Sequence, residues 1–465
     1  MTMSSIPDYK TLLERNELTI AVYGLGYVGL TISSVWIRAG AKVYGVDLDI
    51  KRIESIRSLE ACKFDKDVYN AISEGLKNES LELTVDGVYA SKKSIVKIIA
   101  VPIPLSDRKP IFMFLNKAIE DISHGLKKDD LIVLESSAPP GTTSQILKPK
   151  LEALSKMKCE EDFLLGYSPE RIYIGRGVRD IEENYPKIVA GIGPRSLEAL
   201  ARLYSLVCRK GVLKASSVDV AEFEKIAEGV YRDVNIALSN ELALLASKLG
   251  IDFKEVITLA NSQPYSHLHK SGIGVGGACI PVYPYYMMYV ASRYDLRLDV
   301  INHARGLNES MPRKALEYIL DIARNILKVD GCKISILGLA FRGNIDDTRN
   351  SPSIELIKLL RAELPSDRYP IYIHDPYVKT ESELEALDNV HLSNDLNEVI
   401  KGASIIILAT DHDTYKELSI DKLKDVSGMD IIAVFDGRML LDIEDVKSAR
   451  NIIYAGIGRP TIVNI

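Results

Sequence analysis

Three closely spaced glycines constrain this chain more than any other feature. Gly24, Gly26 and Gly29 form the pattern G-x-G-x-x-G between the apolar run "LTIAVY" and the helix-like stretch "YVGLTISSVWIRAG". A second apolar run, "KVYGVD", follows and ends at Asp47. Glycines at this spacing permit a tight strand-to-helix turn whose helix N-terminus meets a pyrophosphate, and the acid accepts the ribose hydroxyls. The segment therefore predicts a βαβ unit that binds a dinucleotide.

The same segment indicates which dinucleotide is bound. Asp47 favours NAD over NADP, because its carboxylate would repel a 2′-phosphate. Tyr27 and Val28, inside the turn, are predicted to bind the cofactor together with the glycines. Arg52, five residues past Asp47, belongs either to a solvated helix surface or to the adenosine half of the site. The alternative to a dinucleotide site is a strand-to-helix turn that only packs tightly.

Strand-like and helical stretches alternate along most of the remaining chain. With 465 residues the protein is too long for a single core, and apolar runs that end in polar residues recur in both halves. Residues 219–251 have helical spacing and no proline, which predicts a long central helix. The expected fold is α/β, with two Rossmann-like doubly wound domains joined by that helix. The expected domains are residues 1–210, which bind NAD, residues 211–312 and residues 313–465.

Composition excludes several classes of protein. The net charge is −6 with both signs interspersed, which argues against a nucleic-acid partner. No apolar run is long enough to span a membrane, and the five cysteines show neither disulfide nor metal-ligand spacing. The polar start "MTMSSIPDYKTLLERNE" lacks the apolar run of a signal peptide. We therefore expect a cytoplasmic protein with no metal, no nucleic-acid partner and no membrane partner.

Two side chains are candidates for chemistry on the sequence alone. Cys279 lies in the glycine-rich stretch "GIGVGGACIPVYPYYM" and is either a small buried apolar group or a nucleophile. The stretch by itself favours the buried apolar group. Glu170, in "SPER" after an apolar run, is either a general base or a salt-bridged surface residue.

Seven motifs, collinear along the chain, resemble those of the UDP-glucose/GDP-mannose dehydrogenase family and, within it, of the UDP-N-acetylhexosamine 6-dehydrogenase branch. They are "VYGLGYVGL", "SSAPPGTT", "SPER", "EFEKIAEGVYRDVNIALSNELALLA", "GVGGACIP", "ILGLAFRGNIDDTRNSPS" and "FDGR". The resemblance implies four-electron, NAD-dependent oxidation of the C6 alcohol of a UDP-sugar, such as UDP-N-acetylmannosamine, to a uronic acid for polysaccharide biosynthesis. It also implies that residues 211–312 form a homodimer and carry the catalytic cysteine loop, and that residues 313–465 bind the UDP-sugar.

Individual residues also receive roles from this resemblance. Cys279 would be the nucleophile, Lys225 would lie near the reacting oxygen, and Glu170 would transfer a proton. The sugar nucleotide would contact Lys225, Gly276, Phe341, Arg342 and Arg438, and the cofactor would also contact Ser137 and Arg349.

Several positions near the expected reaction centre depart from the family pattern. Where the family has histidine just before the cysteine and aspartate four residues after it, this chain has Ala278 and Tyr283. The family's asparagine four residues after the lysine is Gly229 here. An arginine, a threonine and a proline of the family are replaced by Tyr265, Ile103 and Ile273.

Three kinds of function fit these observations. The first is an active UDP-N-acetylhexosamine 6-dehydrogenase, which the retained Cys279, Lys225 and Glu170 favour. The second is a different enzyme on the same frame, either a UDP-glucose 6-dehydrogenase or one that acts on an altered sugar or stops at the aldehyde. The third is a catalytically silent protein that binds NAD or a nucleotide sugar. For single residues, the alternatives are a solvated helix position for Lys225 and interdomain salt bridges for Arg342 and Arg438.

Overall fold

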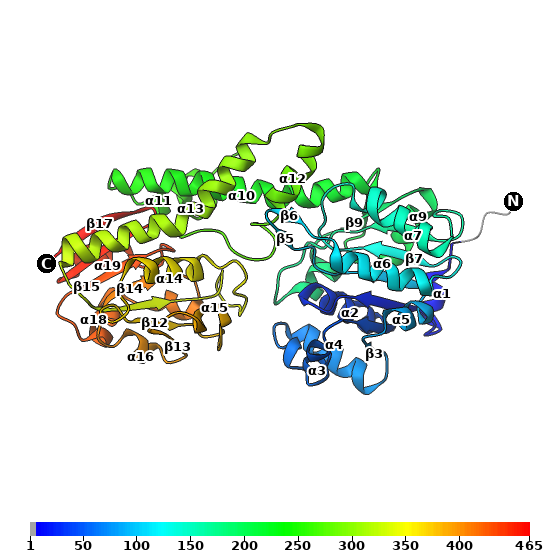
Figure 1. Cartoon of the computed structure of the whole chain (residues 1–465), viewed down its shortest axis with the longest axis horizontal. Helices are drawn as coiled ribbons and strands as arrows, with labels where there is room; N and C mark the ends of the chain where they lie inside the picture. The colour runs from blue at the N-terminus through cyan, green and yellow to red at the C-terminus, as the bar shows by residue number, and fades with distance from the viewer. Residues whose placement is uncertain (1–5) are drawn as a thin grey trace. The chain divides into compact units, whose positions relative to one another are not determined.

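The computed structural model describes residues 6–465, which form two compact units. The first unit comprises the residues up to Glu228 together with Tyr285–Leu296, and the second comprises Gly229–Pro284 together with Arg297–Ile465. Each unit contains one large sheet, drawn mainly in blue to cyan for the first and in yellow to red for the second (Figure 1). Both sheets are of the doubly wound type, which confirms the expected α/β fold with two Rossmann-like domains.

The first sheet has the strand order β10-β9-β8-β7-β4-β1-β2-β3. All neighbours from β3 to β8 in this order are parallel, whereas β9 is antiparallel to β8. Because the winding changes direction between β1 and β4, the loops after those two strands meet at the carboxyl edge of the sheet. The strands are β1 (Thr19–Tyr23), β2 (Lys42–Val46), β3 (Leu81–Thr84), β4 (Val96–Ile99), β7 (Leu131–Leu134), β8 (Leu164–Tyr167), β9 (Lys187–Gly191) and β10 (Val212–Lys214).

Helices cover both faces of this sheet. Every residue of β4 and β7 is buried, and since neighbouring side chains of a strand point to opposite faces, neither face is open to water. In one group the ring pair Trp36–Tyr204 joins two helices and the third packs on the helix that carries Trp36, and a second group packs side by side. The first group is α2 (Tyr27–Ala39), α4 (Lys66–Lys77) and α9 (Pro194–Tyr204), and the second is α5 (Gly87–Lys93), α6 (Met113–Gly125) and α7 (Lys148–Ser155).

The second sheet has the strand order β13-β12-β11-β14-β15-β16-β17, parallel except for the pair β16 and β17. Here the change of winding falls between β11 and β14, so the loops after these strands share the carboxyl edge. The strands are β11 (Lys333–Leu337), β12 (Ile371–His374), β13 (Val390–Ser393), β14 (Ala403–Leu408), β15 (Ile432–Asp436), β16 (Ile452–Gly456) and β17 (Arg459–Asn464).

The predicted long helix is α10, Val218–Lys248, drawn in green in Figure 1. Its last residue comes before the predicted end at residue 251, because Gly250 adopts a φ of 72°, which only glycine takes without strain. None of the helices between residues 6 and 465 has the length and apolar character that crossing a bilayer demands. Helices later in the chain include α11 (Phe253–Ala260), α12 (Tyr283–Ala291), α13 (Asp299–Asp321), α14 (Pro352–Glu363) and α17 (Asp413–Lys416).

A buried polar network joins α10 to α13. Arg305 Nη1 and Asn308 Nδ2 both donate to Asp233 Oδ1 at 2.8 Å. Asn240 Nδ2 donates to Asn308 Oδ1 at 2.9 Å, and Asn240 Oδ1 accepts from the Gly272 N–H at 2.9 Å. This network fixes the start of the glycine-rich stretch. In the sequence, the only indication of this network is that Asp233 and Asn240 are polar and lie seven positions apart, on one face of the helix.

Candidate active site

The predicted dinucleotide turn lies at the carboxyl end of β1, with Gly26 directly before α2. Gly24 has a φ of 90°, and a Cβ atom on Gly29 would overlap the Gly24 carbonyl oxygen, so both positions require glycine. A Cβ atom on Gly26 would meet no other atom within 4 Å. The turn therefore leaves open space beside a helix N-terminus, which fits a pyrophosphate. Tyr27 and Val28 open the helix, and the Tyr27 ring meets the Phe64 ring edge-on at 4.7 Å.

Asp47 lies next to this turn, as the NAD prediction requires. Its Oδ2 accepts from the Leu25 N–H at 2.9 Å and its Oδ1 from the Asp49 N–H at 3.0 Å. Arg52 Nε donates to the Leu25 carbonyl at 2.8 Å. Arg52 therefore fixes the backbone of the glycine turn, a role that neither of its two sequence interpretations included.

The loop after β7 carries Ser137 and is held by an acid that sequence reasoning missed. Glu222 of α10 accepts hydrogen bonds from the Gly141 N–H at 2.6 Å, the Thr143 N–H at 2.8 Å and the Thr143 hydroxyl at 2.6 Å. Burial raises the pKa of Glu222 to about 7, although these three bonds act in the opposite direction. Since Lys225 is three residues further along α10, the same helical turn carries Lys225 and anchors this loop.

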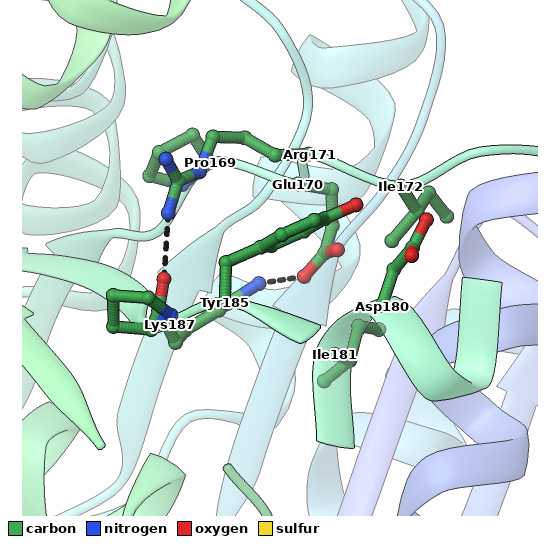
Figure 2. Close-up of a pocket in the computed structure, with 9 residues that line it drawn as sticks. Pro169, Glu170, Arg171, Ile172, Asp180, Ile181, Tyr185 and Lys187 are labelled. Atoms are coloured by element: carbon green, nitrogen blue, oxygen red, sulfur yellow. Dashed lines mark hydrogen bonds and ion pairs between the residues drawn. The ribbon is translucent and has the colours of Figure 1, made fainter. Parts of the chain in front are cut away.

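Glu170 lies in a buried ionic cluster with Glu135 and Lys187 (Figure 2 shows the contact between Glu170 and Lys187). Lys187 Nζ contacts Glu170 Oε1 and lies 2.9 Å from Glu135 Oε2. The Tyr204 hydroxyl donates to Glu135, and its ring centroid is 5.1 Å from Lys187 Nζ. The side chains of Glu170 and Lys187 are each 5% exposed, so Glu170 is paired as one interpretation expected, but in the interior and not at the surface.

A small pocket borders Glu170, with an internal volume of about 10 Å³. That volume is about the size of one water molecule and far too small for a sugar ring. Within this pocket Arg171 Nη2 donates to the Pro186 carbonyl at 2.6 Å (Figure 2). The pocket can place a single water beside the carboxylate, but it is not the sugar site.

Cys279 is exposed, which rules out the buried apolar interpretation of this side chain. Its carbonyl accepts the N–H groups of Val282 and Tyr283 at 3.0 Å each, so the chain turns from the cysteine directly into α12. By contrast, Cys62, Cys159 and Cys208 are buried, and burial raises the pKa of each of those thiols. Cys279 is therefore the cysteine best placed to react.

Two departures from the family pattern touch each other. Tyr283 is 4% exposed, and a Cβ atom on Gly229 would overlap its ring carbon Cδ2. Gly229 stands within α10, where glycine costs about 1 kcal/mol relative to alanine. The tyrosine ring therefore requires the glycine, and the two positions form one matched change.

Three residues expected at the sugar nucleotide come together at the carboxyl edge of the second sheet. Arg438, after β15, donates from Nη2 to the Phe341 carbonyl at 3.3 Å and from Nε to the Ala409 carbonyl at 2.7 Å. A Cβ atom on Gly276 would lie 2.5 Å from Phe341 Cβ, and one on Gly277 would lie 2.9 Å from Phe341 Cζ. Here the glycines make room for Phe341.

Electrostatics at this edge is dominated by Arg438. Burial lowers the pKa of its guanidinium group, and the nearby Asp411 carboxylate opposes that shift. Burial alone would raise the pKa of Asp411, but Arg438 and the Gly343 N–H more than offset it, so the pKa of Asp411 is lowered. The arginine and the aspartate therefore stabilise each other's charged forms.

The remaining predicted residues fall in both units. Lys225 and Glu170 belong to the first unit, whereas Cys279 and Arg342 belong to the second. Arg349, expected at the cofactor, also belongs to the second unit, where its Nε donates to Asp347 Oδ1 at 2.9 Å.

Comparison with known proteins gives a consistent match along the chain. The NAD-binding domain of the UDP-glucose/GDP-mannose dehydrogenase family matches residues 18–207, its central domain residues 219–310 and its UDP-binding domain residues 335–443. UDP-N-acetyl-D-mannosamine dehydrogenase of Pyrococcus horikoshii is 33% identical over 443 residues, which cover 95% of this chain and 99% of that protein. UDP-N-acetyl-D-glucosamine 6-dehydrogenase of Pseudomonas aeruginosa is 31% identical, covering 93% of this chain and 99% of that protein.

The solved structure of the UDP-D-ManNAc dehydrogenase from Pyrococcus horikoshii has the same fold. It covers 95% of this chain and 99% of its own, with a TM-score of 0.85 and 31% sequence identity. The glycine turn beside Asp47 and the edge of the second sheet around Arg438 thus occur in a chain whose NAD-binding and UDP-binding domains both match one family. The protein therefore belongs to the UDP-glucose/GDP-mannose dehydrogenase family and is an NAD-dependent UDP-sugar 6-dehydrogenase.

Proposed function

We propose that the substrate is a UDP-N-acetylhexosamine, such as UDP-N-acetylmannosamine, and that its C6 alcohol is oxidised to the acid through a covalent intermediate on Cys279. The exposed thiol of Cys279 carries this proposal, since it is the group that the second oxidation needs. The identity of the sugar is supported by relatives that act on UDP-N-acetyl-D-mannosamine and UDP-N-acetyl-D-glucosamine.

The chemistry requires two oxidations at one carbon. In the first, the C6 alcohol loses a proton and a hydride and becomes an aldehyde. The Cys279 thiolate then adds to the aldehyde carbon, and the resulting hemithioacetal anion loses a second hydride to give a thioester. Water attacks the thioester, the thiolate leaves, and the sugar acid is released with a proton. NAD, when bound, accepts one hydride in each oxidation, so two NADH are formed per sugar.

Two other side chains support these steps in the proposal. The Lys225 ammonium group stabilises the negative oxygen of each tetrahedral species, a contact whose loss costs about 10²–10³-fold in rate. Glu170 transfers protons, and its pairing with Lys187 fixes the direction of the carboxylate. Phe341, Arg342 and Arg438 hold the sugar nucleotide, with the guanidinium groups pairing with the diphosphate.

A panel of UDP-sugars with NAD tests the proposal directly. We expect UDP-N-acetylmannosamine or a close N-acetylhexosamine relative to have the highest kcat/KM, with two NADH formed per sugar acid. A higher kcat/KM with UDP-glucose would show instead that the protein is a UDP-glucose 6-dehydrogenase. Stabilisation by NAD and UDP without any NADH would favour the silent binding protein, and one NADH per sugar would indicate an enzyme that stops at the aldehyde.

Asp47 provides a test of the cofactor assignment. Asp47→Asn is expected to raise KM for NAD by about tenfold and to improve the use of NADP, because the carboxylate accepts the ribose hydroxyls and repels the extra phosphate. Steady-state kinetics with both cofactors measures the change, and KM for the UDP-sugar serves as the internal control. Wild-type protein that uses NADP as well as NAD would contradict this role for Asp47.

We further propose a homodimer formed through α10. Leu238, Leu242 and Leu245 are all exposed, and their spacing of four and three residues places them on one face of the helix. An exposed apolar stripe of this kind is typical of a helix-helix interface. Sedimentation of the protein at twice the chain mass of 51.6 kDa would support the dimer, and sedimentation at the chain mass would contradict it.

The cysteine pattern supports a proposed compartment for this protein, and the chemistry of the product supports a proposed role in metabolism. Five cysteines without disulfide spacing favour a reducing compartment such as the cytoplasm. A UDP-activated uronic acid is a sugar donor, so the reaction that consumes the product is a glycosyl transfer, as in polysaccharide biosynthesis.

A further inference from the structure

Three consecutive residues after β14 hold the loop that follows β11. Asp411 Oδ1 accepts from the Gly343 N–H at 2.9 Å, and His412 Nδ1 accepts from the Asn344 N–H at 3.0 Å. Asp413 Oδ2 accepts from Asn344 Nδ2 at 2.7 Å, while the Asp413 N–H donates to Asn344 Oδ1 at 3.0 Å. Each of the three residues makes its own contact, so the backbone of the loop is fixed at two successive positions.

His412, at the centre of this group, is fully buried, and its hydrogen bonds define which ring nitrogen donates and which accepts. A backbone N–H can only donate, so the Nδ1 atom that faces Asn344 carries no proton. The ring proton then lies on Nε2, which is 3.1 Å from Asp375 Oδ2. The imidazole therefore bridges Asp375 and Asn344, donating on one side and accepting on the other.

Asp375 anchors the bridge to the sheet. Its Oδ2 also accepts from the Leu339 N–H at 2.7 Å and the Ala340 N–H at 3.0 Å, in the turn directly after β11. Its Oδ1 accepts two N–H groups from the loop after β12. Burial alone would raise the pKa of Asp375, but His412 and these N–H groups lower it to about 2. The carboxylate is therefore ionised and holds both ends of the β11 loop, directly at one end and through His412 at the other.

Two aromatic rings restrict the imidazole further. The Tyr377 ring stacks on it at 5.2 Å with an angle of 27° between the planes, and the Tyr415 ring meets its edge at 5.3 Å. The ring cannot turn without displacing these neighbours, so the acceptor atom keeps its direction toward Asn344.

We propose that His412 is a positioning residue for the sugar nucleotide. By accepting from the Asn344 N–H, His412 fixes the conformation of the loop backbone. That conformation determines the direction in which the side chains of Phe341 and Arg342 point. This inference rests on the proposed function, in which Phe341 and Arg342 contact the UDP-sugar. Loss of the acceptor removes the partner of the Asn344 N–H, so the loop relaxes and UDP binding weakens while NAD binding, in the other unit, is retained.

Two substitutions of His412 distinguish the contributions of its two ring nitrogen atoms. In His412→Asn the amide oxygen can take the place of Nδ1 and accept from Asn344, whereas in His412→Gln the amide nitrogen can take the place of Nε2 and donate to Asp375. We expect His412→Gln to raise KM for the UDP-sugar and Kd for UDP about tenfold, with changes below about twofold in kcat and in KM for NAD. His412→Asn is expected to raise them less. His391→Gln, at an exposed histidine of β13, is the control and should match wild type.

Hydrogen exchange of the Asn344 amide gives a readout that does not depend on activity. The amide is expected to exchange faster in His412→Gln than in wild type or His412→Asn. A His412→Gln protein with wild-type Kd for UDP and wild-type exchange would overturn the positioning role, as would equal weakening in both variants with a common loss of thermal stability. A wild-type protein that binds no UDP by calorimetry would instead overturn the proposed function on which the inference rests.

Discussion

Replacing Cys279 with serine is expected to abolish formation of the sugar acid, with a fall in kcat of more than about 10³-fold. A serine hydroxyl is almost entirely protonated at neutral pH and is a far weaker nucleophile than a thiolate. An oxygen ester is also a poorer acyl carrier than a thioester. Measurement of NADH together with the sugar acid, by absorbance and mass spectrometry, tests this result.

The matched control is Cys332→Ser, because Cys332 is a partly buried free cysteine of the same unit that lies outside the proposed site. That variant should retain wild-type activity, and both variants should bind NAD as wild type does. Normal acid formation by Cys279→Ser would disprove the covalent route and would point to oxidation of an aldehyde hydrate.

Wild-type kinetics gives a second view of the same step. With Tyr283 in place of the family's aspartate, the attacking water is less well held, so hydrolysis of the thioester should limit turnover. We expect a burst of two NADH per active site, followed by a slow steady state, with the sugar acid attached to Cys279 in quenched samples. A linear time course without a covalent adduct would contradict this expectation.

Gly229→Asn is expected to destabilise the protein strongly, because even its Cβ atom would overlap the Tyr283 ring. Overpacking of a buried site typically costs about 1–3 kcal/mol, and this overlap lies on a rigid aromatic ring next to a helix. Tyr283→Asp should be destabilising for the opposite reason. It empties the space of a large buried side chain, a loss of about 3–5 kcal/mol, and leaves a carboxyl group facing the vacated volume.

The double variant Gly229→Asn with Tyr283→Asp restores the family's pair of polar residues. Because each change fills or empties the same space, we expect the double variant to be more stable than the sum of the single effects by about 1–3 kcal/mol. Denaturant unfolding of all four proteins measures this coupling. Strictly additive free energies would show that the two positions are independent.

The same set of variants distinguishes the effect of Tyr283 on packing from its effect on the water that attacks the thioester. Tyr283→Asp by itself changes both, so a slow variant would be ambiguous. In the double variant the packing is restored, and a shorter slow phase after the burst would assign the delay in wild type to the missing aspartate. An unchanged slow phase would mean that the pocket handles water in another way.

The fold could be predicted because its signals are local. The G-x-G-x-x-G turn, the acid at the end of the next strand and the apolar runs each lie within about thirty residues, and the right-handed crossover rule then determines the sheet topology. Gly250 also indicates the end of the long helix, since glycine is common just after a helix. The prediction nevertheless ran to residue 251, because the apolar Ile251 continues the helical pattern.

The site was less predictable, because its contacts join distant parts of the chain. Glu170, after β8, meets Lys187, the first residue of β9, because these two strands pair antiparallel, and the sequence of neither strand reveals its partner. The fit of Tyr283 to Gly229 spans α10 and α12, and periodicity carries no information on such a pair. Gly276 and Gly277, shortly before Cys279, accommodate Phe341, a contact between distant parts of the chain that no local pattern indicates.

Counter-ions have little access to the buried cluster of Glu135, Lys187 and Glu170, whose side chains are at most 5% exposed. Dissolved salt screens exposed charges over about 8 Å at physiological ionic strength but acts far less on pairs that are removed from water. Surface pairs such as Arg209 with Glu183 should therefore dissociate in concentrated salt while the carboxylate of Glu170 keeps its orientation. Inhibition of this enzyme by high salt would then be traced to anions that compete for Arg342 and Arg438, which we propose hold the sugar nucleotide, and not to a change at Glu170, which we propose transfers protons.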